Sequence, residues 1–83
     1  MPRDENKTSD FVRCLAAVIR ERREELGMSL TQLGTAAGLS QQSVSYLERL
    51  MRLPNIETLH RIADALDIRL SVLIQEAEKR MGL

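Results

Sequence analysis

The sequence predicts an all-α fold, a compact domain of five helices, for three reasons. First, 83 residues allow one domain with a modest core. Second, hydrophobic residues make up 43% of the chain but aromatic residues only 2%, so the core must be aliphatic. Third, the aliphatic residues recur at the three- and four-residue spacing that gives a helix one apolar face. We expect residues 1–8 to be a flexible N-terminal segment and residues 9–83 to form the domain.

The first helix is expected to begin at Ser9 or Asp10, either of which can cap it, and to end at Leu26 before Gly27. Apolar residues at helical spacing give this helix a face for the core. These residues are Phe11, Leu15, Val18, Ile19 and Leu26. The charged residues of its last turns are expected to be mostly solvated.

Two short helices joined by a turn are predicted within residues 30–48, LTQLGTAAGLSQQSVSYLE. Ser29 can cap the first of them, and Gln32 can reach back as the second half of a capping box. Gly38 can end this helix in the left-handed conformation, and Ser40 can cap the next one. A pair of helices joined in this way is a device that reads DNA.

The small and apolar residues of this pair predict which faces pack together. Leu33 and Ala37 lie on one face of the first helix, while Val44 and Leu47 lie on one face of the second. Gly34 is expected where the helices cross, because a larger side chain would push them apart. The other face of the second helix carries side chains that can hydrogen-bond to base edges or phosphates. These are Gln41, Gln42, Ser45 and Tyr46.

A connector over residues 49–53 follows the second helix and ends at Pro54. Asn55 can cap a fourth helix over residues 56–66, and a fifth helix is expected over residues 70–80. Both have an apolar stripe. The stripe residues are Leu59, Ile62, Ala63 and Leu66 in the fourth helix, and Leu70, Leu73, Ile74, Ala77 and Met81 in the fifth.

Residues 19–73, about two thirds of the chain, resemble the five-helix, lambda-repressor-like domain of the repressor/Cro (XRE-type) family. IRERREELGMS resembles the end of the family's first helix and VSYLE its recognition helix. LPNIETLHRIADALDIRLSVL resembles the fourth and fifth helices with the loop before them. The resemblance implies a transcriptional regulator of the repressor, restriction-controller or antitoxin type, whose partner is double-stranded DNA.

Two glutamines open the recognition helix of this motif, and a glutamine can form a bidentate pair with adenine N6 and N7. We therefore expect Gln41 and Gln42 to read bases, the alternative being that they are ordinary polar surface. Ser45 and Tyr46 lie one turn further on. Tyr46 can donate to a phosphate, pack on a thymine methyl group or lie over the connector instead.

Phosphate contacts are expected from three residues around the recognition helix. Arg49 and Arg52 are the cations nearest to the groove. The hydroxyl of Ser29 and the free amides at its helix start can hold a phosphate as well. Surface arginines without a ligand are the alternative for the two cations.

The resemblance also implies an ion pair. The family motif has a glutamate at the position of Glu48 that pairs with an arginine near the end of the first helix, and Arg23 occupies that position. A partly buried bridge between them would fix the recognition helix against the first helix, and the loss of either partner would strand a charge.

The chain departs from the family pattern at three positions. Leu30 stands in place of a glutamine that touches phosphate, so one DNA contact is missing. Gly34 replaces an alanine, which weakens the helix by up to about 1 kcal/mol. Leu50 replaces a glycine after the recognition helix, and because leucine resists the left-handed conformation, the helix is expected to continue.

The connector is unusually apolar, and we expect it to belong to a subunit interface. Leu50, Met51 and Leu53 lie there beside Ile56. The expected interface of a homodimer consists of Leu50, Leu53, Ile56, Leu70 and Ile74.

The charge balance supports the need for a second subunit. Twelve Lys and Arg residues offset twelve Asp and Glu residues, which argues against non-specific coating of nucleic acid. Within residues 28–55 the only charges are Glu48, Arg49 and Arg52, so the DNA face carries a net charge of +1. A homodimer on a palindromic operator is therefore the predicted active form.

Other classes of function have little support. Cys14 and His60 are the only residues of their types, so we expect no disulfide, metal site, cofactor or catalytic group, and hence no enzyme. The sequence has no membrane-spanning run or signal peptide, and we expect a cytoplasmic protein with no membrane contact. It carries no signal for contact with a toxin or with RNA polymerase. The competing prediction is a protein-interaction module that has kept the fold and lost DNA binding, supported by the zero net charge, Leu30 and Leu50.

Overall fold

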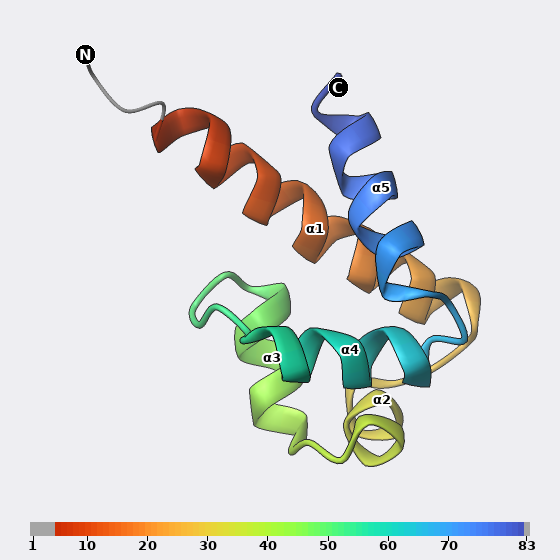
Figure 1. Cartoon of the computed structure of the whole chain (residues 1–83). Coiled ribbons are helices and arrows are strands. Elements are labelled where there is room, and N and C mark those ends of the chain that lie inside the picture. Colours follow the sequence, from red (N-terminus) through yellow and green to blue (C-terminus); the bar gives the residue numbers. More distant parts are fainter. Residues whose placement is uncertain (1–4, 83) are drawn as a thin grey trace.

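The computed structural model describes residues 5–82, in which five helices account for most of the chain (Figure 1). They are α1 (Glu5–Glu25), α2 (Leu30–Ala37), α3 (Gln41–Glu48), α4 (Ile56–Ala65) and α5 (Leu70–Arg80). The predicted all-α, five-helix class is confirmed.

Every helix contributes to one aliphatic core. The most deeply buried large side chains are Ile19, Leu33, Val44, Ile62, Leu66 and Leu73. Helix α1 packs against α5 and α3, while α2 packs against α3 and α4. Figure 1 shows α2, α3 and α4 grouped at one end of the molecule, with α1 and α5 crossing beside them. Helices α1 and α4 therefore pack against the inner side of the α2–α3 pair, and its outer side faces solvent.

Helix α1 begins earlier than predicted. It starts at Glu5 and contains Ser9 and Asp10, the two residues expected to cap it. Residues 5–8 of the expected flexible segment are therefore helical, and residues 1–4 lie outside the described part of the chain. No glycine or proline interrupts residues 5–25, so nothing in the local sequence forces the helix to begin at the later position. At the other end, Leu26 was expected on the core face of this helix, but its side chain is 43% exposed.

The predicted caps of α2, α3 and α4 are confirmed. The Ser29 hydroxyl accepts a hydrogen bond from the Gln32 amide at 3.0 Å, and the Gln32 side chain accepts one from the Ser29 amide at 2.8 Å. Gly38 ends α2 with a φ of 73°. The side chains of Ser40 and Asn55 accept hydrogen bonds from amides in the first turns of α3 and α4, at 3.0 and 2.8 Å. These caps fix where the α2–α3 turn and α4 begin.

The prediction that α3 continues past Leu50 is wrong. The helix ends at Glu48, and Leu50 adopts the left-handed conformation with a φ of 61°. The Leu50 amide donates to the Leu47 carbonyl at 3.1 Å, and the Met51 amide donates to the Tyr46 carbonyl at 2.8 Å. These two bonds satisfy the end of α3 and turn the chain toward α4. For leucine this conformation costs about 1–2 kcal/mol.

Replacing Leu50 with glycine is expected to raise the free energy of unfolding by about 0.5–1 kcal/mol, because the backbone strain disappears while the entropy of the unfolded chain rises. Urea denaturation would measure this difference. The matched control is Leu50→Ala, which keeps the strained Cβ and loses the apolar contacts, and is expected to be no more stable than the wild type. A Leu50→Gly variant less stable than Leu50→Ala would contradict the prediction.

In the described part of the chain, none of the helices has a stretch that is long and apolar enough to cross a membrane.

Candidate nucleic-acid interface

Helix α3 sits very close to the end of α2 because Gly34 has no side chain. The Leu39 amide donates to the Gly34 carbonyl at 2.7 Å. A Cβ atom added at Gly34 would lie 2.7 Å from the Leu39 carbonyl oxygen and 3.2 Å from the carbonyl carbon of Ser40. The same Cβ would lie 3.3 Å from the amide nitrogen of Gln41, the first residue of α3. The prediction that Gly34 lies where the two helices meet is therefore confirmed.

The inner face of α3 is buried and its outer face is polar, as predicted. Val44 and Leu47 belong to the core together with Leu33 and Ala37 of α2. On the outer face the side chains form two pairs, each four residues apart. Nε2 of Gln42 donates to the phenol oxygen of Tyr46 at 2.5 Å, and Nη1 of Arg49 donates to Oγ of Ser45 at 3.4 Å. Gln41 is exposed at the start of the helix.

The loop after α3 brings Arg52 against the same face. Its guanidinium carbon lies 5.5 Å from the centroid of the Tyr46 ring. Of the alternatives for Tyr46, a contact with the connector is therefore present. Ser29 is exposed at the start of α2, separate from the α3 face, and its oxygen accepts the capping bond. Its hydroxyl hydrogen can still donate to a ligand.

Arg23 and Glu48 form the ion pair that the resemblance implies. Nε of Arg23 donates to Oε2 of Glu48 at 2.7 Å, and Nη2 donates to Oε1 at 3.0 Å. The two side chains are only 12% and 6% exposed, and Nη1 of Arg23 also donates to the Met28 carbonyl at 2.8 Å. Hydrogen bonding to Glu48 raises the pKa of Arg23 above its ordinary value. The pair joins the last turns of α1 to the last residue of α3.

This geometry changes the charge that a ligand would meet. Glu48 is turned inward and neutralised by Arg23, so its carboxylate does not face solvent. Arg49 and Arg52 are exposed. Within residues 28–55 the surface therefore presents two cations and no exposed carboxylate, which is more favourable to an anionic partner than the net charge of +1 suggested.

Two further arginines, Arg22 and Arg61, lie behind or beside the α2–α3 pair. Nε of Arg22 donates to the Leu66 carbonyl at 3.1 Å, and Nη2 donates to the Asp67 carbonyl at 3.3 Å, which ties the end of α4 to α1. Arg61 lies beside the α2–α3 turn, with Nη1 3.9 Å from the position of a Cβ on Gly38. No local sequence pattern predicts either arrangement, because both depend on the packing of α4.

The residues expected at a subunit interface fall into two groups. Leu50, Leu53 and Ile56 are 41%, 67% and 69% exposed, and together with Met51 they form an apolar patch on the loop and the start of α4. Leu70 and Ile74 on α5 are partly buried against the core. The first group is therefore exposed to solvent, whereas the second group is partly buried.

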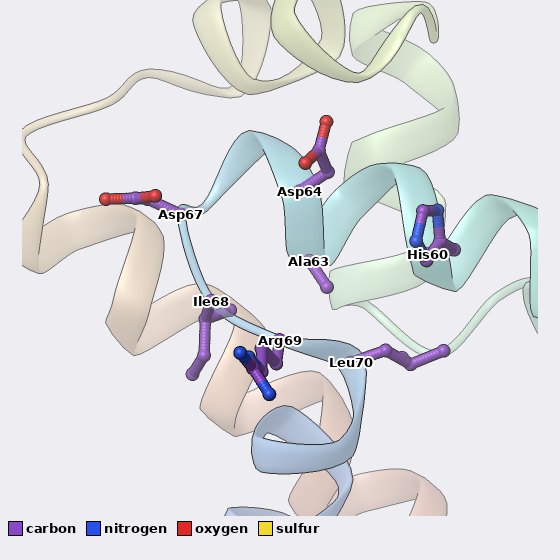
Figure 2. A pocket seen from close by; sticks show the side chains of 7 residues that line it. All are labelled: His60, Ala63, Asp64, Asp67, Ile68, Arg69 and Leu70. Carbon is purple, nitrogen blue, oxygen red and sulfur yellow. The ribbon is translucent and has the colours of Figure 1, made fainter.

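A hollow of about 300 Å³ lies between α4 and the start of α5 (Figure 2). Figure 2 shows the carboxylates of Asp64 and Asp67 pointing in different directions, with His60 about one turn before Asp64 in α4 and Arg69 in the segment that leads into α5. Within residues 5–82 no three His, Cys, Asp or Glu side chains gather closely enough to hold a metal ion. The titratable groups of this hollow therefore do not converge on one point.

Comparisons with known proteins agree with the fold and with the α2–α3 unit. Residues 19–73 match the family model described as Helix-turn-helix. The chain is similar to the ImmF control region 10 kDa protein of Bacillus phage phi105, with 36% identity over 59 residues, 71% of this chain. The match spans 66% of that relative, just under two thirds of its length.

Two solved structures are similar over most of the chain. One is a single-site mutant of the restriction-modification controller protein C.Esp1396I, with a TM-score of 0.81 and 25% identity, covering 86% of this chain and 92% of that one. The other is the clp gene regulator ClgR from Corynebacterium glutamicum, with a TM-score of 0.80 and 28% identity, covering 87% and 77%. The chain belongs to the XRE-type helix-turn-helix family of DNA-binding transcriptional regulators, which are not enzymes.

Proposed function

We propose that this chain binds double-stranded DNA as a homodimer on a palindromic or near-palindromic operator and controls transcription from it. The observation that carries the proposal is the outer face of α3. It presents amide, hydroxyl and guanidinium groups, while the one carboxylate of the helix is buried against Arg23. Two such helices spaced by one turn of B-DNA would enter successive major grooves and read two half-sites.

The proposed contacts divide into two kinds. Gln41 and Gln42 at the start of α3 read base edges, with Ser45 available one turn later. Arg49, Arg52 and Ser29 hold phosphates and set the register. The names of the similar proteins, a control region protein, a controller protein and a gene regulator, support a regulatory role.

A second subunit is proposed because two exposed cations on the DNA face supply too little binding energy alone. The apolar patch of Leu50, Met51, Leu53 and Ile56 offers a surface for it, since side chains up to 69% exposed would otherwise face water. Leu70 and Ile74, partly buried on α5, are also proposed as interface residues.

A gel shift against the DNA upstream of the chain's own gene tests the proposal, because a regulator of this size commonly controls its own promoter. We expect a complex that unlabelled specific DNA displaces and random DNA does not, with nanomolar affinity of about 10⁻⁸ M. Light scattering should give a dimer at tens of micromolar, roughly the range in which a useful dimer persists. The matched control is Leu53→Asp, which is expected to give a folded monomer with much weaker binding.

Gln41→Ala and Arg49→Ala are expected to separate base reading from phosphate contact. Gln41→Ala should remove about 1–3 kcal/mol of discrimination at one base pair of each half-site. Arg49→Ala should weaken binding to all DNA sequences by a similar factor. It should also lower the slope of log K against log salt concentration by about one unit per subunit. Binding isotherms on operator variants at several salt concentrations measure both effects. Unchanged base preferences in Gln41→Ala would show that α3 does not dock as proposed.

The second candidate function is a protein-interaction module that has kept this fold and lost DNA binding. The exposed patch around Leu53 and Ile56 favours it, together with the zero net charge of the chain. Leu30, which replaces the family's phosphate-contacting glutamine, is packed against the core instead. A dimer that binds no DNA sequence selectively would support this function over the first.

A further inference from the structure

Tyr46 contacts a candidate base reader and a candidate phosphate ligand at the same time. Its phenol oxygen accepts the hydrogen bond from Gln42 at 2.5 Å, and its ring lies under the guanidinium of Arg52 at 5.5 Å. Its backbone carbonyl accepts the Met51 amide at 2.8 Å, where the chain leaves α3. One residue thus connects the outer face of the recognition helix to the loop that follows it.

We propose that Tyr46 is a positioning residue that holds Gln42 in the orientation for adenine and Arg52 in the orientation for phosphate. The inference rests on the proposed function, because it assumes that α3 lies in the major groove. It differs from the expectation that Tyr46 itself touches DNA, since here the phenol acts through its two neighbours.

The hydrogen-bonding capacity of Gln42 supports this role. A glutamine amide has two N–H donors and one carbonyl, and Tyr46 takes up one donor. One N–H and the carbonyl remain, and these are the groups that adenine N7 and N6 require. An exposed glutamine without such a partner samples many rotamers and must be immobilised when it binds. Holding it beforehand removes part of that entropic cost.

The geometry of Arg52 supports the second half of the role. The guanidinium carbon of Arg52 lies within cation–π range of the Tyr46 ring, and such a contact does not require a hydrogen bond from the N–H groups to another protein group. Arg52 therefore remains able to donate to a phosphate while the ring restricts where the loop can carry it. An arginine on a free loop would lack this restriction.

The test uses Tyr46→Phe, Gln42→Ala and the double variant on an operator that the wild-type chain selects from a random DNA library. Tyr46→Phe should lower the preference for adenine at one position of each half-site by about three- to tenfold. In the Gln42→Ala background the same change should have no further effect on that preference. The salt slope should not change, because phenylalanine keeps the ring beneath Arg52.

Tyr46→Leu is the matched variant that removes both contacts. It should lose the adenine preference and also reduce the salt slope by about one unit per subunit, as Arg52→Ala should. Equal thermal midpoints for the wild type and Tyr46→Phe show that the fold is unaffected.

Three results would overturn the inference. Unchanged base preference in Tyr46→Phe would show that the phenol does not position Gln42. If Tyr46→Phe weakened binding to all DNA sequences equally, the phenol would bind phosphate itself. If Tyr46→Phe caused a further loss of base preference in the Gln42→Ala background, the phenol would read a base itself. Failure of the wild-type chain to select any sequence is a separate outcome, which would overturn the proposed function and this inference with it.

Discussion

Replacing Glu48 with alanine is expected to lower the free energy of unfolding by about 3 kcal/mol, and Arg23→Ala by at least as much. Both side chains are almost fully removed from water and joined by two hydrogen bonds, so each single change leaves a buried charge without its partner. The stranded Arg23 would still donate to the Met28 carbonyl. A stranded Glu48 would lose both of the hydrogen bonds that its carboxylate accepts from Arg23, and Arg23→Ala should therefore be the more damaging change.

The chain offers a matched control for this prediction in the pair of Arg80 and Glu21. That pair also has two hydrogen bonds, both 2.6 Å long, and they lower the pKa of Glu21. Its side chains are 40% and 50% exposed, however, so Glu21→Ala should change stability little. Urea denaturation of all three variants measures the difference. Equal midpoints for Glu48→Ala and Glu21→Ala would show that burial of the Arg23–Glu48 pair does not matter.

The helix caps could be predicted because they depend on residues three or four positions apart. The box formed by Ser29 and Gln32, the glycine stop at Gly38, and the caps at Ser40 and Asn55 are all local chemistry. They define the α2–α3 turn, and this is why the central motif was recognisable in the sequence alone.

The features that sequence reasoning missed depend on distant contacts or on the absence of a local signal. The bonds from Arg22 to Leu66 and Asp67 join residues more than forty positions apart. Leu50 was expected to continue the helix on local propensity, but the chain must turn there to reach α4, and tertiary structure overrides that preference. The early start of α1 at Glu5 was missed because several residues near the N-terminus can cap a helix, and local sequence does not choose among Asp4, Asn6, Thr8, Ser9 and Asp10.

In the candidate site, too, the features set by local sequence could be predicted and those set by distant contacts could not. The outer face of α3 follows from helical spacing, so its polar residues could be predicted, and their contacts with DNA remain predictions. The inward orientation of Glu48 came only from the family resemblance. The positions of Arg52 over Tyr46 and of Arg61 beside Gly38 required the structure, because each depends on the path of a loop or on the packing of α4.

Gly34→Val is expected to lower the free energy of unfolding by about 2–3 kcal/mol and to abolish sequence-selective DNA binding. Helix propensity alone favours almost any residue over glycine here, by up to about 1 kcal/mol for alanine. The steric term opposes it, because a Cβ would lie 2.7 Å from the Leu39 carbonyl oxygen, a backbone atom that cannot rotate away. Relieving this overlap requires the turn to move, and α3 with it.

The two terms can be separated with Gly34→Ala and Ala36→Val. Gly34→Ala adds the Cβ together with the best helix former, so its loss should be smaller than that of Gly34→Val but still a loss. Ala36 is exposed on the same helix, and Ala36→Val therefore measures the cost of a β-branched residue without the overlap. We expect Ala36→Val to unfold near the wild-type urea concentration and to bind the operator normally. If Gly34→Val matched it in both measurements, the turn could move without cost, and the close approach at Gly34 would not be what sets the position of α3.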